Sequence, residues 1–357
     1  MKYRLYLLLI FISVTASAQN KPLKLFPADN PLIRYVGRFE VSNPQAPRVW
    51  TAGAYMLARF KGKQCEVLVN DEVMYGKSHN YLEIVVNDQK PYRIKTTGKT
   101  NVITIPDSLL NAGANTLLIC KDTETHIGYI EFAGIRCAEL LPLKHQPKYK
   151  IEYYGDSITS GAGMDLSEVP CDKGEWYDQH NAYMTYGART SRNLDADWQL
   201  TSVAGIGLVH SCCDMKVAMP QVYDKLYLRN DSLNWDFKRY RPDVVTICLG
   251  QNDGAQDSTL FCGAYVKFID TLRSKYPAAD IVCLTSPMAD AKLTAILQRY
   301  LTAITAYENN KGDSKVSKYF FSKRYSNGCG THPDMAEHEL IANELTGYIR
   351  KLKGGGK

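Results

Sequence analysis

A serine near the middle of the chain follows a short apolar run. The run Ile151–Tyr154 breaks at Gly155, and Ser157 comes two residues later. This pattern predicts a strand that ends in a tight turn into a helix. In such a turn a serine hydroxyl stands clear of the sheet edge, near backbone N–H groups at the helix start. Ser157 is therefore a candidate nucleophile.

Three other residues lie at positions in the predicted fold from which they could contact a ligand. Gly205 and Asn252 each follow a predicted strand, and His332 directly precedes the last predicted helix. Ligands of open parallel sheets bind beyond the carboxyl ends of the strands. We therefore expect these three residues to meet Ser157 at one rim of a single sheet.

The elements that must position these residues lie between 146 and 353. Strands and helices alternate there, which predicts a parallel sheet covered by helices on both faces. The expected strands are 151–154, 198–203, 244–249, 281–285 and 319–321. The expected helices are 182–194, 258–276, 289–308 and 333–351.

The preceding part, residues 19–145, carries short alternating segments and no long amphipathic helix. The expected strands are 32–39, 48–50, 55–60, 65–69, 81–86, 101–105, 116–120 and 129–135. Many short strands at this spacing predict an antiparallel sandwich, resembling a jelly roll. The proline-bearing stretch 141–147 is the expected linker between the two domains.

Both ends of the chain are expected to lie outside the two domains. Residues 1–18 have a positive start, an apolar run and the small-residue site Ala16–Ala18, which is the pattern of a secretory signal peptide. The apolar run is too short for a membrane span. The protein is thus expected to be exported, to the periplasm or the extracellular space. Residues 354–357 are expected to form a flexible tail.

Composition narrows the possible partners. A net charge of +6 over 357 residues is mild, and lysine and arginine are scattered, so no nucleic-acid surface is expected. The sequence has no C-x-x-C pair, so no zinc site is expected, and we assign no metal or cofactor. Export would permit disulfides. The better candidates for disulfides are Cys171, Cys212, Cys213, Cys262 and Cys329, while Cys120, Cys248 and Cys283 lie in apolar runs and are expected to be buried.

These motifs together resemble the SGNH or GDSL hydrolase superfamily. Four of its blocks occur in order, as Gly155–Thr159, Gly205, Gly250–Asp253 and the pair His332-Pro333. The resemblance covers about residues 150–352 and implies an α/β/α, flavodoxin-like catalytic domain. Together with the β-rich domain before it, the chain is similar to carbohydrate esterase family two, which deacetylates plant polysaccharides.

The resemblance also implies roles. Ser157 would attack an acetyl carbonyl, and His332 would carry the proton to the leaving sugar oxygen. The Ser157 and Gly205 N–H groups and the Asn252 amide would form the oxyanion hole. The neighbouring Asp156 is expected to hold its loop by hydrogen bonds, and Asp253 likewise.

The chain departs from the superfamily pattern at one position. Most members carry an aspartate three residues before the histidine, where this chain has Cys329. A cysteine cannot stabilise an imidazolium as a carboxylate does. We therefore expect a Ser157–His332 dyad whose imidazole is oriented by a backbone carbonyl. Asp334 and Glu337 are expected to point away, and Cys329 to be in a disulfide or simply packed.

Two residues are assigned to substrate binding. Trp176 lies in a loop rich in acidic and aromatic residues, where an exposed indole could stack on a sugar face or instead pack structurally. Thr331, beside His332, is the second.

The leading hypothesis is a secreted serine esterase that removes O-acetyl groups from an acetylated polysaccharide or oligosaccharide. Two alternatives remain open. One is a GDSL-type lipase or thioesterase, although the sequence shows no long apolar lid. The other is a non-catalytic carbohydrate-binding protein in which the β-rich domain does the binding.

Overall fold

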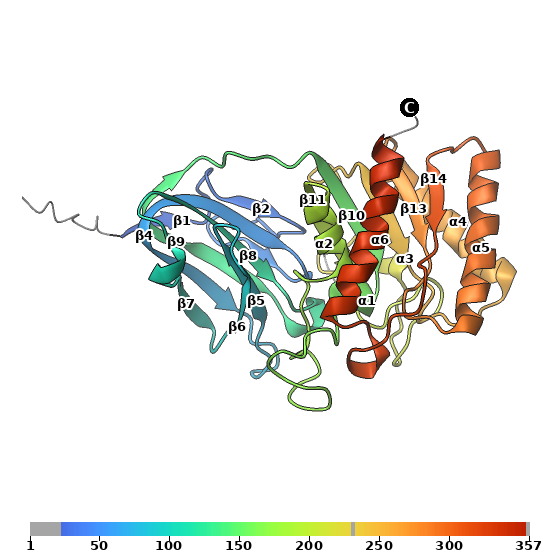
Figure 1. Ribbon diagram of the computed structural model, residues 1–357, viewed down its shortest axis with the longest axis horizontal. Coiled ribbons are helices and arrows are strands. Elements are labelled where there is room, and N and C mark those ends of the chain that lie inside the picture. Colours follow the sequence, from blue (N-terminus) through green and yellow to red (C-terminus); the bar gives the residue numbers. More distant parts are fainter. Residues whose placement is uncertain (1–22, 230–232, 355–357) are drawn as a thin grey trace, which may run out of the picture.

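The structure is a computed structural model that describes residues 23–229 and 233–354. An antiparallel β-domain lies beside a parallel α/β domain, and the chain passes from one to the other after β9 (Ile130–Leu141) (Figure 1). The predicted signal peptide lies outside the described residues, as do residues 355–357 of the predicted tail. Gly354, the first residue of that tail, instead ends helix α6 (Met335–Gly354). No helix in the described ranges is long and apolar enough to cross a bilayer.

The long strand β4 (Tyr55–Asp71) organises the β-domain. Its first part pairs with β2 (Arg34–Val36) and β8 (Ala114–Lys121), and its later part pairs with β7 (Thr100–Thr104) and β9, all antiparallel. The sheet is completed by β1 (Lys24–Pro27), β3 (Arg48–Val49), β5 (Tyr81–Val86) and β6 (Tyr92–Lys95). Two short 3-10 turns, η1 (Asp107–Leu109) and η2 (Thr125–Ile127), follow β7 and β8.

Buried side chains alternate with more exposed ones in each half of β4. The alternating buried positions are Met56, Ala58 and Phe60 before an irregularity in the pairing with β9, and Cys65, Val67 and Val69 after it. Period-two burial of this kind places one face of a strand on the core. The predicted all-β fold of this half is confirmed. The two strands predicted at 55–60 and 65–69 are one strand, and β1 and β6 were not predicted.

The α/β domain has five parallel strands in the order β11-β10-β12-β13-β14, which is the flavodoxin-like order. They are β10 (Tyr149–Gly155), β11 (Ala196–Ser202), β12 (Val244–Cys248), β13 (Asp280–Leu284) and β14 (Val316–Tyr319). The predicted parallel fold is confirmed. The last strand begins earlier than the predicted 319–321.

Helices cover both faces of this sheet. The buried side chains of α2 (Tyr186–Asn193) and α6 join one apolar cluster, and those of α4 (Ser258–Lys275) and α5 (Ala291–Asn310) join another. Two short helices, α1 (Ser157–Ser160) and α3 (Met219–Val222), follow β10 and β11. Asp257 and Asp290 begin α4 and α5 because their carboxylates accept first-turn N–H groups.

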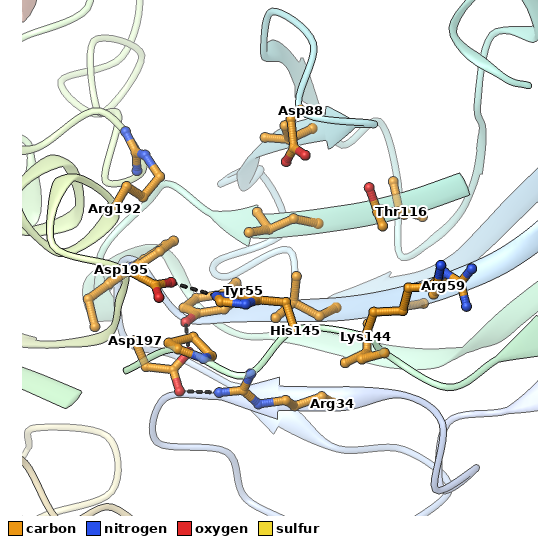
Figure 2. A pocket seen from close by; sticks show the side chains of 18 of the residues that line it. Arg34, Tyr55, Arg59, Asp88, Thr116, Lys144, His145, Arg192, Asp195 and Asp197 are labelled. Atoms are coloured by element: carbon orange, nitrogen blue, oxygen red, sulfur yellow. Dashed lines mark hydrogen bonds and ion pairs between the residues drawn. The ribbon is translucent and has the colours of Figure 1, made fainter. Parts of the chain in front are cut away.

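The two domains share one apolar cluster. The ring of Tyr55 in β4 stacks on Trp198 in β11, with centroids 4.1 Å apart. A pocket of about 500 Å³ lies along this boundary. At one side of the pocket, polar side chains of the β-domain pair with Asp197 of the α/β domain (Figure 2). Asp197 accepts from Tyr55 at 2.7 Å and forms an ion pair with Arg34.

A buried ion pair also crosses the boundary. The guanidinium of Arg38, from the β-domain, lies 3.1 Å from the Glu152 carboxylate in β10, and both side chains are fully buried. The same guanidinium donates to the carbonyl oxygens of Tyr223 and Lys225. Breaking such a pair from one side leaves a charge buried and uncompensated, so the two domains depend on each other.

We predict that Arg38→Met lowers the free energy of unfolding by about 3–5 kcal/mol, because Glu152 keeps its burial and loses its counter-charge. Urea denaturation would measure the change. As a matched control, Arg136→Met breaks an ion pair with Glu66 that is partly open to solvent, and it should cost about 1 kcal/mol or less. Equal losses in the two variants would contradict the prediction.

Candidate active site

Ser157 is the first residue of helix α1, directly beyond the end of β10. Its neighbour Asp156 begins the helix, because the Asp156 Oδ1 atom accepts the Ile158 N–H at 3.0 Å. Position 155 must be a glycine, because a Cβ there would lie 2.0 Å from the Thr159 hydroxyl oxygen. The turn thus holds the serine at the carboxyl end of the sheet.

The imidazole of His332 lies against the serine. Its Nε2 atom is 2.8 Å from the Ser157 Oγ atom, and its Nδ1 atom is 2.9 Å from the Cys329 carbonyl oxygen. A carbonyl can only accept, so Nδ1 carries the hydrogen and Nε2 is free to accept the serine proton. Burial lowers the pKa of His332, so the imidazole is neutral at neutral pH.

The Cys329 carbonyl is held in place by its surroundings. The Cys329 N–H donates to the Gly163 carbonyl at 2.8 Å, and the Cys329 side chain forms a disulfide with Cys171. A Cβ on Gly163 would lie 2.7 Å from the Cys329 carbonyl oxygen, and Gly163 has φ +68°. Only glycine therefore lets the two loops approach so closely.

No carboxylate takes the place of that carbonyl. The Asp334 and Glu337 side chains bond to backbone N–H groups at the start of α6, with the Glu337 N–H 2.8 Å from Asp334 Oδ1. Neither makes a hydrogen bond to His332 within the described residues. Their carboxylates are used by these backbone contacts, which agrees with the expectation that they do not hold the imidazole.

Gly205 and Asn252 lie beside Ser157 in the same pocket. Gly205 has φ +82°, and a Cβ there would lie 2.9 Å from the Cys212 sulfur. No hydrogen bond in the described part of the chain uses the Gly205 N–H. The Asn252 Nδ2 atom donates to the Ile206 carbonyl at 2.9 Å and, less closely, to Asp156 at 3.2 Å.

The two aspartates hold loops, as expected from the sequence. Asp253 accepts the N–H groups of Leu208, Val209 and His210 at 2.6–3.0 Å, and thereby fixes the loop after β11. Asp156 is fully buried, and burial raises its pKa to about 7.

The pocket around Ser157 has a volume of about 730 Å³, and charged and amide side chains line it together with small and apolar ones. Trp176 is 54% exposed on its wall, with its ring edge-on to His180 at a centroid distance of 4.9 Å. Thr331, the second residue assigned to substrate binding, is not among the residues that line this pocket, and its role stays a prediction. Its side chain is exposed where the chain turns with φ +62°, and Gly330 forms the wall instead.

The pocket residues that the sequence analysis did not assign include Glu124, His126 and His180. Glu124 and His126 come from the turn after β8 in the β-domain. The buried His180 ring has no hydrogen-bond partner on either nitrogen among the described residues. For Glu124 and His126, the local signal in the sequence was the concentration of polar residues in the stretch Lys121–His126.

Comparison with known proteins agrees with this arrangement. A family model described as Carbohydrate esterase 2 N-terminal matches residues 35–147, and one for the GDSL-like Lipase/Acylhydrolase family matches residues 153–314. A solved structure of a family two carbohydrate esterase from Clostridium thermocellum in complex with cellohexaose has a TM-score of 0.81 and 29% identity, over 90% of this chain and 99% of that one. The chain belongs to carbohydrate esterase family two.

Two curated relatives of this family two chain are similar over most of its length. Cellulase/esterase CelE of Acetivibrio thermocellus is 32% identical over 91% of this chain, which spans 40% of the length of CelE. An acetylxylan esterase / glucomannan deacetylase of Cellvibrio japonicus is 25% identical over 97% of this chain and 96% of its own length.

The cysteines of this family two chain divide as the sequence suggested, with one exception. Cys171–Cys329 and Cys212–Cys213 form disulfides. Cys262 was wrongly included among the disulfide candidates. It is a free thiol on the half-buried face of α4, where no second cysteine is bonded to it. Cys120, Cys248 and Cys283 are buried and free, as expected.

We predict that Cys171→Ala raises the pKa of His332 toward the ordinary value of 6.5. Without the disulfide the loop that carries Cys329 can move, and the imidazole regains solvent. NMR titration of the His332 ring protons would measure the pKa. Cys262→Ala removes a free thiol outside the pocket and should leave that pKa unchanged. An unchanged His332 pKa in Cys171→Ala would contradict the prediction.

Proposed function

We propose that this protein is a secreted serine esterase that removes O-acetyl groups from a polysaccharide or oligosaccharide. The observation that carries the proposal is the 2.8 Å contact between Ser157 Oγ and His332 Nε2 at the wall of an open pocket. A serine hydroxyl bonded to a neutral, oriented imidazole is an activated nucleophile.

The first half of the reaction forms an acetyl-enzyme. Ser157 Oγ attacks the acetyl carbonyl while His332 Nε2 accepts its proton. The imidazolium then donates that proton to the sugar oxygen, which leaves as an alcohol. The Cys329 carbonyl keeps Nδ1 protonated and the ring in position, although it offers no negative charge to the imidazolium.

The oxyanion would be stabilised by three donors. The N–H of Ser157 has no acceptor within its own helix because it is the first residue of α1. The Gly205 N–H is available beside it. The Asn252 amide hydrogen that meets Asp156 at 3.2 Å is the one that the oxyanion would take over.

The second half of the reaction releases acetate. A water molecule replaces the departed sugar, His332 accepts its proton, and the resulting hydroxide attacks the acetyl-serine carbonyl. The same three donors stabilise the second tetrahedral intermediate. Ser157 recovers its proton from His332, so the enzyme returns to its initial state.

The lining of the pocket favours a sugar over a lipid. Charged and amide side chains are numerous in it, including Glu124, Asp172, Lys173, Glu175 and Gln179, and a long acyl chain would bury against them at a cost. Trp176 presents an exposed ring on which a sugar face could stack. The relatives named for acetylxylan and glucomannan deacetylation, and the relative bound to cellohexaose, support the same class of substrate. The leader-like residues 1–18 support export.

We predict that Ser157→Ala lowers kcat at least about 1,000-fold, since the nucleophile is removed. Acetate release from acetylated xylan and acetylated glucomannan, and hydrolysis of 4-nitrophenyl acetate, would measure it. Ser160→Ala is the matched control, because that hydroxyl bonds the Ser157 carbonyl in the same helix and does not contact His332.

Three outcomes would contradict this proposal. Full activity of Ser157→Ala would exclude the serine as nucleophile. A preference for 4-nitrophenyl octanoate over the acetate would favour a lipase. A wild-type protein that binds glycans and releases no acetate would be a non-catalytic binder.

We predict that the acidic limb of kcat/KM has its midpoint below pH 6.5. His332 must be neutral to act as base, and burial holds its pKa below the ordinary value of 6.5. Activity is therefore full above that lowered pKa and is lost as the pH falls through it. A pH profile with 4-nitrophenyl acetate would measure the acidic limb, and a midpoint at or above pH 6.5 would contradict the prediction.

A further inference from the structure

A short turn of the β-domain is buried in the α/β domain. Residues Asp122–Thr125, which follow β8, are fully buried and make three hydrogen bonds across the boundary. Asp122 accepts from the Tyr183 N–H at 3.1 Å, Glu124 from the Ala204 N–H at 2.6 Å, and Thr125 donates to the Tyr227 carbonyl at 2.6 Å. The turn is thus fixed to the catalytic domain at three separate places.

Glu124 is the member of this turn that reaches the pocket. One carboxylate oxygen accepts the Ala204 N–H, and the other lies 3.1 Å from the Nδ1 atom of His126, which also lines the pocket. Burial opposes a charge on Glu124, but these hydrogen bonds outweigh burial and hold its pKa below the ordinary range. A charged acceptor gives the shorter and stronger kind of hydrogen bond.

The Ala204 N–H group that Glu124 holds is adjacent to the proposed oxyanion hole. Ala204 directly precedes Gly205, so fixing the Ala204 N–H restrains the residue whose carbonyl forms the peptide bond with the Gly205 nitrogen. On the other side, the Gly205 carbonyl accepts from the Cys212 N–H at 2.8 Å. Gly205 is therefore restrained from both sides, and the restraint before it comes from the other domain.

We propose that Glu124 is a positioning residue for the oxyanion hole. This inference rests on the proposed esterase function. By holding Ala204, Glu124 fixes the direction of the Gly205 N–H before substrate arrives, so that the donor needs no reorganisation in the transition state. The β-domain then contributes to catalysis through this carboxylate, in addition to packing against the catalytic domain.

The test compares two replacements of nearly equal size. Glu124→Gln keeps an oxygen that can accept the Ala204 N–H, whereas Glu124→Met fills the space without an acceptor. We expect Glu124→Met to lower kcat for 4-nitrophenyl acetate about 10- to 100-fold with little change in KM, because misplaced catalytic groups cost rate more than binding. Glu124→Gln should recover most of that loss.

Thr125→Val is the matched control. It removes another hydrogen bond of the same turn, to the Tyr227 carbonyl, and Thr125 does not line the pocket. We expect it to lower the melting temperature and to leave kcat unchanged. All variants are assayed well below their melting temperatures.

The outcomes separate this inference from the proposed function. Equal kcat in Glu124→Met and Glu124→Gln, or a loss in Thr125→Val as large as in Glu124→Met, would overturn the positioning role and leave a structural one. If Glu124→Met alone folds, its kcat is compared with that of Thr125→Val, and no difference overturns the proposal. If Glu124→Gln alone folds, a kcat well below that of Thr125→Val overturns it, because the glutamine keeps an acceptor for the Ala204 N–H. An inactive wild-type protein would count against the esterase function itself.

Discussion

The contact between Ser157 and His332 depends on a backbone carbonyl. The Cys329 oxygen fixes the tautomer and the direction of the imidazole, which in most members of the superfamily is the task of an aspartate. A carbonyl can orient the ring but cannot balance the charge of an imidazolium. Orientation therefore has to be rigid, and it is: the carbonyl lies between a glycine that leaves no room for a side chain and a disulfide that ties its residue to a distant loop. Burial of the His332 ring lowers its pKa and thereby keeps the imidazole neutral.

The two domains form one functional unit. Apolar packing of Tyr55 on Trp198 joins them, and the buried Arg38–Glu152 pair makes their separation costly. At the pocket, Glu124 crosses the boundary to the residue before Gly205. The pocket wall thus draws on both domains. This arrangement gives a physical reason for the β-domain to accompany the catalytic domain, whether or not it also contacts the glycan.

The sequence predicted those features that local pattern determines. Apolar runs located the sheet strands, and the rule that ligands lie beyond the carboxyl ends of parallel strands brought Ser157, Gly205 and Asn252 together. β1 and β6 were missed because each has only four residues, too few for a pattern of burial to show in the sequence. Glu124 could not be assigned, since its partner is 80 residues away in the other domain. Thr331 was chosen for its adjacency to His332 in sequence, but it is exposed and lies outside the lining of the pocket, and its assignment stays a prediction.

The two residues of the proposed catalytic pair are also far apart along the chain. Ser157 and His332 are separated by 175 residues, and the disulfide that supports the histidine loop joins residues 158 apart. Four of the five parallel strands lie between the two catalytic residues in sequence. Closing so large a loop costs chain entropy before any contact compensates for it. The nucleophile and its base can therefore meet only after most of the sheet has assembled. During refolding, the return of hydrolysis would follow the return of secondary structure and would report completed assembly.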